Sequence, residues 1–207
     1  MGQYLRLQGR AKIKILDIGG GTGLFWERLL AEFPNIELTI CDLFDPGNLR
    51  DFAHKRIRSS FEESLPSLSD RSFDLVTAID LLEHLDVATG YRLLYQMQRI
   101  TKKTMAVYTP NGFVWQPPST NNPYNAHVSG WEMKTLRNFG FSSILGHVGH
   151  KSMIGPYSRP KNRIENPYLA LALEKIGEQL CVRFPSQAFA LSGWMNCEFT
   201  YSVDQAR

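Results

Sequence analysis

The sequence predicts an α/β fold in which helices cover both faces of a doubly wound, mostly parallel sheet. Short β-branched segments alternate with helical segments through the first two-thirds of the chain, and this alternation is typical of strand–helix–strand units with right-handed crossovers. A glycine-rich turn follows the first predicted strand, where sheets of this kind often bind a ligand. With 207 residues, 43% of them hydrophobic, we expect a single domain that covers residues 1–207.

Seven segments have the composition and periodicity of β-strands. Each is a short run of β-branched or other apolar residues, either continuous or alternating with polar ones. They cover residues 12–18, 36–41, the neighbourhood of Ile57, 73–79, 104–108, 141–148 and 188–203. The third segment has the weakest pattern of the seven.

Four segments have the spacing of apolar residues that is typical of helices. They cover residues 24–33, 86–100, 130–139 and 166–180. Asp86 is expected to cap the second helix, because its carboxylate can accept a backbone N–H of the first turn. Ser129 and Glu132 fit a capping box for the third helix, which Gly140 would end. The pair Asn166–Pro167 is expected to start the fourth.

Two segments are predicted to cover a substrate. Residues 112–127 are rich in Pro, Asn and Gln, which indicates a surface loop, and residues 151–180 begin with a basic, turn-prone stretch. The cations of that stretch could meet a phosphate-bearing acceptor, although a solvated basic loop is the commoner explanation. They are Lys151, Arg159, Lys161 and Arg163.

Composition restricts the function classes. The net charge of +3 is too low to indicate nucleic-acid binding by itself, and no apolar stretch approaches the roughly 20 residues of a membrane helix. The N-terminal segment lacks the apolar run of a secretory signal. Three cysteines, far apart in the sequence, argue against a disulfide framework. We therefore expect a cytoplasmic protein with no nucleic-acid partner and no membrane insertion.

The glycine-rich turn carries the first functional signal. Asp17 ends the first predicted strand, and the segment Gly19–Gly23 contains four glycines before the first helix. Glycines let the backbone turn tightly and approach a ligand without interference from a Cβ atom. The dinucleotide fingerprint G-x-G-x-x-G would place another glycine where Leu24 stands, so the turn fits a nicotinamide site poorly.

An acidic residue, Asp42, ends the second predicted strand, about 20 residues past the turn. The two oxygens of a carboxylate can accept hydrogen bonds from both hydroxyls of a ribose. The alternative is an acid that is merely solvated at the end of a strand. The glycine turn before it favours the ribose-binding interpretation.

Four segments together resemble the successive motifs of class I S-adenosylmethionine-dependent methyltransferases. They read ILDIGGGTG, ICDLF, SFDLVTAIDLLEHL and YTPNG, in the family's order, between about Ile13 and Phe141. The segment His127–Trp131, HVSGW, is similar to a segment of some bacterial small-molecule enzymes of this family. The resemblance implies a seven-stranded sheet with an antiparallel last strand, and S-adenosylmethionine as the cofactor.

The resemblance also implies roles for individual residues. Asp17 would help to anchor the methionine ammonium group, Asp42 would hold the ribose hydroxyls, and Leu43 would lie against the adenine. Asp80 and Leu81 would lie beside the methyl-bearing sulfonium. Four glycines would lie alongside the methionine and ribose portions of the cofactor: Gly19, Gly20, Gly21 and Gly23.

The sequence departs from the family's pattern in two places. Relatives often have an acid after the third strand that takes the adenine amino group, whereas this segment reads SSFEE. Glu62, a backbone group or stacking alone would therefore hold the adenine. About a dozen residues precede the first strand, where many relatives have further helices, so we expect either an unusually open site or a shortened chain.

Two histidines are the candidate catalytic residues. Transfer to a hydroxyl or a protonated amine requires removal of a proton, and imidazole is the side chain best suited to that near neutral pH. His127 lies in the predicted loop after the fifth strand, and His84 follows the fourth. Each is a candidate general base or substrate contact, and for each a structural role is the alternative. No group of His, Asp, Glu and Cys has metal-ligand spacing, so no metal is expected.

Aromatic residues near His127 have two interpretations. Asn122-Pro123-Tyr124 invites comparison with the N-P-P-Y signature of amino-methylating enzymes, but it lacks one proline and follows the fifth strand instead of the fourth, so we reject it. Trp115, Tyr124 and Trp131 could line an apolar acceptor pocket, and core packing explains Trp131 equally well.

These observations predict an enzyme that transfers a methyl group from S-adenosylmethionine to a hydroxyl or amine of a small molecule, such as a sugar, a lipid precursor or a secondary metabolite. Two alternatives remain open at this level. One is a nicotinamide-dependent oxidoreductase, against which Leu24 argues. The other is a methyltransferase-like binding module without catalysis.

Overall fold

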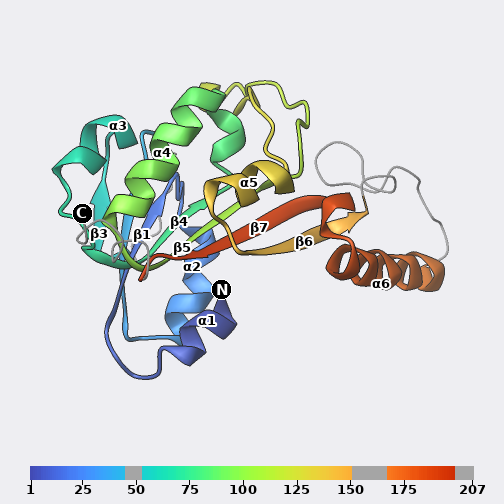
Figure 1. Cartoon of the computed structure of the whole chain (residues 1–207), viewed down its shortest axis with the longest axis horizontal. Coiled ribbons are helices and arrows are strands. Elements are labelled where there is room, and N and C mark those ends of the chain that lie inside the picture. Colours follow the sequence, from blue (N-terminus) through green and yellow to red (C-terminus); the bar gives the residue numbers. More distant parts are fainter. Residues whose placement is uncertain (45–52, 151–166, 199–207) are drawn as a thin grey trace, which may run out of the picture. The chain divides into compact units, whose positions relative to one another are not determined.

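The computed structural model describes residues 1–44, 53–150 and 167–198 (Figure 1). The chain divides into two compact units. Unit 1 contains residues 1–79 and 91–106 together with the residues from 196 onward, and unit 2 contains residues 80–90 and 107–195.

Seven strands of the described chain belong to one sheet, in the order β3-β2-β1-β4-β5-β7-β6. β1 pairs in parallel with β2 and with β4, β2 pairs in parallel with β3, and β6 and β7 are antiparallel. The predicted seven-stranded, mostly parallel sheet is therefore confirmed. The strands are β1 (Ile13–Ile18), β2 (Ile36–Cys41), β3 (Lys55–Ile57), β4 (Phe73–Ile79), β5 (Thr101–Pro110), β6 (Ser143–His150) and β7 (Ala188–Asn196).

The strand order reverses at β1, because the chain passes from β1 outward to β2 and β3 and then returns to β4 on the other side of β1. In open α/β sheets the carboxyl ends of the strands at such a reversal are where ligands bind. β1 has the sequence pattern of a strand covered on both faces, since Ile13, Ile15, Leu16 and Ile18 are all buried.

The helices are close to the predicted ones, with two short additions that periodicity could not reveal, α1 and α3. Asp86 caps α4 as expected, because its Oδ1 accepts a hydrogen bond from the Thr89 amide at 3.1 Å. The predicted cap Asn166 lies outside the described residues. The helices are α1 (Gly2–Leu7), α2 (Leu24–Glu32), α3 (Phe61–Ser64), α4 (Val87–Ile100), α5 (Met133–Phe139) and α6 (Pro167–Arg183).

The predicted capping box at Ser129 and Glu132 is wrong. α5 begins at Met133, and Glu132 occupies its N-cap position without a side-chain hydrogen bond. Ser129 is buried, and its Oγ donates to the carbonyl oxygen of Leu82 at 3.1 Å. A long-range contact has therefore taken the hydroxyl that the local pattern assigned to the helix. Gly140 ends α5 as predicted.

Of the two segments expected to cover a substrate, the structure describes the first completely and the second only in part. Residues 113–122 contain neither helix nor strand, as predicted, and the turn η3 (Pro123–Asn125) follows them. Of the segment 151–180, residues 151–166 and the four basic residues singled out there lie outside the described chain. Within unit 2, α6 packs against β6 (Figure 1). None of the described helices is long and apolar enough to cross a membrane.

Candidate functional site

The glycine turn of unit 1 joins β1 to α2. Gly19, Gly21 and Gly23 have φ angles of 72°, 50° and 81°, in the left-handed region that residues with a Cβ atom rarely adopt. The amide of Gly19 donates to the carbonyl oxygen of Cys41 at 2.8 Å. The turn therefore starts where the ends of β1 and β2 are tied together.

Asp17 packs against this turn so closely that Gly20 has no room for a side chain. A Cβ atom on Gly20 would lie 2.6 Å from Asp17 Oδ2. The Asp17 carboxylate is 2% exposed, and it accepts hydrogen bonds from Trp26 Nε1 at 2.8 Å and Thr77 Oγ1 at 2.6 Å. Burial raises the pKa of Asp17 to about 6, while these two hydrogen bonds lower it. Asp17 thus fixes the turn from within the core of unit 1.

Asp42, directly after β2, also holds the turn. Its Oδ2 accepts a hydrogen bond from the amide of Gly21 at 2.6 Å, and its Oδ1 accepts one from the amide of Phe44 at 2.8 Å. Both oxygens of the predicted ribose-binding carboxylate are therefore oriented by backbone groups.

Arg56, on β3, is a residue of this site that sequence analysis missed. Its guanidinium donates to two carbonyl oxygens of the turn, those of Gly21 and Thr22, each at 3.2 Å. The planar fork of Arg suits two adjacent acceptors. No local pattern marks such a residue, because its partners are more than thirty residues earlier in the chain.

Two further predicted cofactor residues lie on the surface of unit 1. Leu43, directly after β2, is 52% exposed. Glu62 is exposed in the first turn of α3, where Ser60 Oγ accepts the amide of Glu63 at 3.3 Å and caps the helix. An exposed apolar side chain and an exposed acid are thus available on unit 1, with the adenine contacts themselves still a prediction.

Asp80 opens the functional part of unit 2, immediately after β4. Its φ angle is 49°, which is uncommon for a residue other than glycine and is often found at functional sites. Its amide donates to the carbonyl oxygen of Tyr108 at 2.9 Å. The half-buried Leu81 follows, and the chain then forms the turn η2 (Leu82–His84).

Glu83 is a buried acid that sequence analysis did not single out. The residue is 2% exposed, and its Oε2 accepts a hydrogen bond from Thr109 Oγ1 at 2.9 Å. Burial raises the pKa of Glu83 to about 8, and the negative charge of Asp80 raises it further. Desolvation also raises the pKa of Asp80, against a hydrogen bond from Glu83 and the charge of His127. We conclude that Glu83 keeps the proton that the two acids share.

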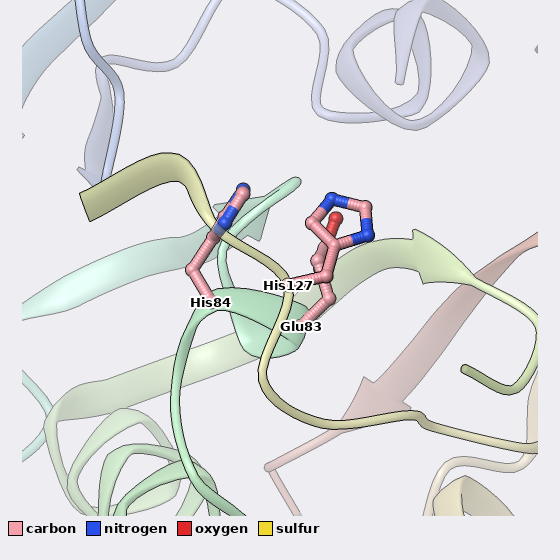
Figure 2. Close-up of side chains that lie close together, drawn as sticks. All are labelled: Glu83, His84 and His127. Atoms are coloured by element: carbon pink, nitrogen blue, oxygen red, sulfur yellow. The ribbon is translucent and has the colours of Figure 1, made fainter. Parts of the chain in front are cut away.

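His84 and His127 lie beside Glu83 although they come from different segments, η2 and the loop after β5 (Figure 2). Their ring centroids are 4.9 Å apart, with the planes at 70°. Desolvation lowers the pKa of His84, and the charge of His127 acts in the same direction. The structure therefore brings together the two histidines that the sequence proposed independently.

Both rings are oriented by backbone carbonyl groups. His84 Nδ1 lies 3.0 Å from the carbonyl oxygen of Ala126, and His127 Nδ1 lies 2.6 Å from that of Val114. A carbonyl oxygen can only accept, so Nδ1 is the protonated nitrogen in each neutral ring. In each ring Nε2 is then the nitrogen that can offer a lone pair.

The segment that carries His127 is clamped onto η2. The amides of Val128 and Ser129 both donate to the carbonyl oxygen of Glu83, at 2.8 and 3.1 Å. A Cβ atom on Gly130 would lie 2.4 Å from the amide nitrogen of Phe113, so glycine is required there by a close backbone approach. The HVSGW segment thus positions the histidine.

The three aromatic residues considered for an acceptor pocket differ in solvent exposure. Trp131 is buried, and its Nε1 donates to the carbonyl oxygen of Leu82 at 3.0 Å, so it belongs to the core of unit 2. Trp115 and Tyr124 are exposed on the loop that carries His127. The core interpretation is therefore correct for Trp131.

Comparison with known proteins agrees with the fold and with the motifs. Residues 16–114 match the family model of a methyltransferase domain. A SAM-dependent methyltransferase from Archaeoglobus fulgidus aligns over 94% of this chain and 92% of its own, with 19% identity and a TM-score of 0.58. An S-adenosylmethionine-dependent methyltransferase from Mesorhizobium loti aligns over 94% and 96%, with 14% identity and a TM-score of 0.54. No curated protein matches the sequence significantly.

The matched region contains the glycine turn, Asp42 and the Asp80–His84 segment. The fold is that of the S-adenosylmethionine-dependent methyltransferases named above, and residues 16–114 match a methyltransferase domain. The match to a methyltransferase domain argues against the nicotinamide-dependent alternative.

Proposed function

We propose that this protein is a class I S-adenosylmethionine-dependent methyltransferase that acts on a hydroxyl or amine of a small-molecule acceptor. The observation that carries the proposal is the group formed by Asp80, Glu83, His84 and His127, in which two imidazoles adjoin two carboxyl groups. The sulfonium donor already has an excellent leaving group, so the protein mainly aligns the partners and receives a proton. The two imidazoles of this group can receive a proton, which suits a methyl acceptor atom that carries one.

The cofactor is held by the turn and the acids of unit 1. An ionised carboxylate has about four lone-pair positions, and backbone amides use one on each oxygen of Asp42. The remaining positions can accept the two ribose hydroxyls. Asp17 anchors the methionine ammonium group through the turn that it supports, and Leu43 packs on the adenine while Glu62 accepts its amino group.

Four more residues complete the cofactor and proton-transfer roles. Asp80 and Leu81 lie beside the sulfonium, as in the family's pattern. His127 is the general base, because its Nε2 carries the lone pair in a segment that is hydrogen-bonded in place. His84, whose lowered pKa favours the neutral form, is the second proton acceptor.

The acceptor has an apolar or ring-bearing part. Exposed large apolar side chains gather on the segment that carries the base: Phe113, Trp115 and Tyr124 are 59%, 66% and 57% exposed. Aromatic side chains of this kind commonly bind flat or apolar ligands. The net charge of +3 is small for tracking the phosphates of a nucleic acid, which supports a sugar, lipid precursor or secondary metabolite instead.

The cofactor half is tested by calorimetry with S-adenosylmethionine on the wild type, Asp42→Ala and the control Glu37→Ala. Glu37 is an acid of β2 that pairs with Lys12 on the surface. We expect Asp42→Ala to lose about 10²-fold in affinity, as expected for two charge-assisted hydrogen bonds, and Glu37→Ala to bind as the wild type does. Equal affinity in all three proteins would remove Asp42 from the ribose site.

The acceptor half is tested by a panel of hydroxyl- and amine-bearing small molecules, with peptide and RNA arms, in which formation of S-adenosylhomocysteine is followed. Turnover confined to small molecules is expected. Turnover only in the peptide or RNA arm would overturn the acceptor class. Tight cofactor binding without turnover in any arm would instead favour the non-catalytic binding module.

A further inference from the structure

We propose that Glu83, His84 and His127 bind one divalent transition-metal ion. One ligand atom from each residue lies within 4.8 Å of the other two (Figure 2). Once the ion displaces the proton of Glu83, two imidazole nitrogens and one carboxylate oxygen form a donor set that favours zinc and neighbouring first-row metals over magnesium or calcium. Sequence spacing does not indicate this metal site, because His127 is far from Glu83 and His84 in the chain and only the fold brings it to them.

The hydrogen bonds of the two histidines support this assignment. Metal-binding histidines almost always donate their other ring N–H to a carbonyl or carboxylate, which fixes the ring and the tautomer. Both rings do so here, through Nδ1 to the carbonyl oxygens of Ala126 and Val114. The same bond in both neighbouring rings leaves each Nε2 with the lone pair that a metal ion requires.

The distance between the rings also fits. With metal–nitrogen bonds of about 2.0–2.1 Å, two imidazoles on one ion at about 90–110° have their centroids roughly 4.5–5.2 Å apart. The observed centroid separation is 4.9 Å. Ligand atoms up to 4.8 Å apart would have to approach each other by about 1.5 Å to reach the spacing of a coordinated set, and both histidines are half-buried.

The third ligand is held in position by its neighbours. Thr109 Oγ1 donates to Glu83 Oε2, and the amides of Val128 and Ser129 donate to the Glu83 carbonyl oxygen. These bonds hold η2 and the His127 loop together, so the three ligands stay close to one another. Three protein ligands leave at least one coordination position for an exogenous oxygen, which distinguishes a catalytic metal site from a closed structural one.

The consequence for catalysis rests on the proposed function, whereas ion binding itself does not. An ion on both Nε2 atoms would occupy the lone pairs that otherwise act as base, and would lower the pKa of an acceptor hydroxyl bound to it. The hydroxyl O–H bond would then break with release of the proton to solvent. The oxygen would form its bond to the methyl carbon while the bond between sulfur and that carbon breaks. The sulfonium would thereby become the thioether product. The metal-bound form therefore favours a hydroxyl acceptor.

The test is titration of chelator-treated protein with Co²⁺, followed by calorimetry and by visible absorption, without cofactor or acceptor. We expect one equivalent to bind, with absorption bands of a nitrogen- and oxygen-ligated ion, displacement by Zn²⁺ and no competition from millimolar Mg²⁺. His84→Ala, His127→Ala and Glu83→Gln should each weaken binding by about 10-fold or more.

Controls keep this test decisive. His54→Ala removes a histidine of unit 1 whose Nδ1 accepts the Leu38 amide, and it should bind Co²⁺ as the wild type does. Glu83→Gln keeps an acceptor for Thr109 and should remain folded by circular dichroism, even if a histidine variant does not. Absence of stoichiometric binding by the wild type, or unchanged affinity in Glu83→Gln and both histidine variants, would overturn the site. Either result leaves cofactor binding and turnover, measured separately, unaffected.

Discussion

The glycine turn of unit 1 and the acid–histidine group of unit 2 are built in different ways. The turn is a continuous stretch whose shape is set by backbone conformation, with three glycines at positive φ. The acid–histidine group consists of side chains from the end of β4, the turn η2 and the loop after β5. Hydrogen bonds between segments hold it, such as those from Val128 and Ser129 to the Glu83 carbonyl oxygen.

This difference determines what a substitution should do in each region. In the turn, the chemistry of binding comes from backbone groups, so side chains matter mainly where they support the backbone. In the acid–histidine group, the chemistry lies in the side chains, and their positions depend on contacts far along the chain. Substitutions outside the reactive residues should therefore disturb unit 2 more than unit 1.

Gly130→Ala should give the largest effect. The new Cβ atom would lie 2.4 Å from the Phe113 amide nitrogen and 2.7 Å from its Cα, and backbone atoms cannot rotate out of the way. We expect unfolding to become easier by about 3 kcal/mol, with loss of turnover as the His127 segment shifts. Urea denaturation measures the first effect.

Gly2→Ala is the matched control for that variant, because no atom lies within 4 Å of a Cβ placed on Gly2. Its stability should equal that of the wild type. Wild-type stability and turnover in Gly130→Ala would show that the His127 segment does not depend on the close backbone approach at Gly130. The expected greater sensitivity of unit 2 to substitution would then be wrong.

His127→Ala should reduce turnover on an acceptor found in the panel by about 10²-fold or more. The reason is loss of the imidazole Nε2 beside Glu83, and affinity for S-adenosylmethionine should be nearly unchanged. Steady-state rates with His54→Ala as the control measure the effect. Unaltered turnover would transfer the role to His84 or leave proximity alone as the source of rate.

The same difference explains what the sequence could reveal. Asp17, the glycines and Asp42 lie in contiguous motifs, so their local placement could be predicted, along with β1, β2 and β4. Arg56 and Glu83 could not, because the importance of Arg56 comes from two carbonyl groups of a distant turn and that of Glu83 from burial beside Asp80. Ser129 was assigned to a local cap for the same reason, since its real partner, Leu82, is remote.

Asp17 should make the free energy of unfolding depend on pH. Its pKa in the folded protein is about 6, above the ordinary 3.8, chiefly because of burial. The folded state therefore binds the proton more tightly, and the stability that Asp17 contributes falls as pH rises towards 6 and is constant above it. Relative to Asp17→Asn, the wild type should lose about 2 kcal/mol between pH 4.5 and 7. Parallel urea titrations at several pH values check this, and a pH-independent difference would contradict the burial argument.

Arg56→Ala should have the smallest effect of the four, and it is the one substitution that tests whether the turn is as local as it looks. Removing the guanidinium leaves the carbonyl groups of Gly21 and Thr22 to water but leaves the φ angles of the glycines intact. We expect affinity for S-adenosylmethionine to fall by about 10-fold, or about 1.4 kcal/mol.

Arg56→Lys should recover only part of that loss, because a single ammonium cannot reach two acceptors as the planar fork does. Lys55→Ala, an exposed neighbour on β3, is the control and should bind like the wild type. Calorimetry with S-adenosylmethionine on the four proteins shows whether the turn needs Arg56 for its shape. Graded affinities would mean that the turn, like the acid–histidine group, needs a remote side chain, whereas identical affinities would mean that glycine conformation and Asp42 suffice to shape it.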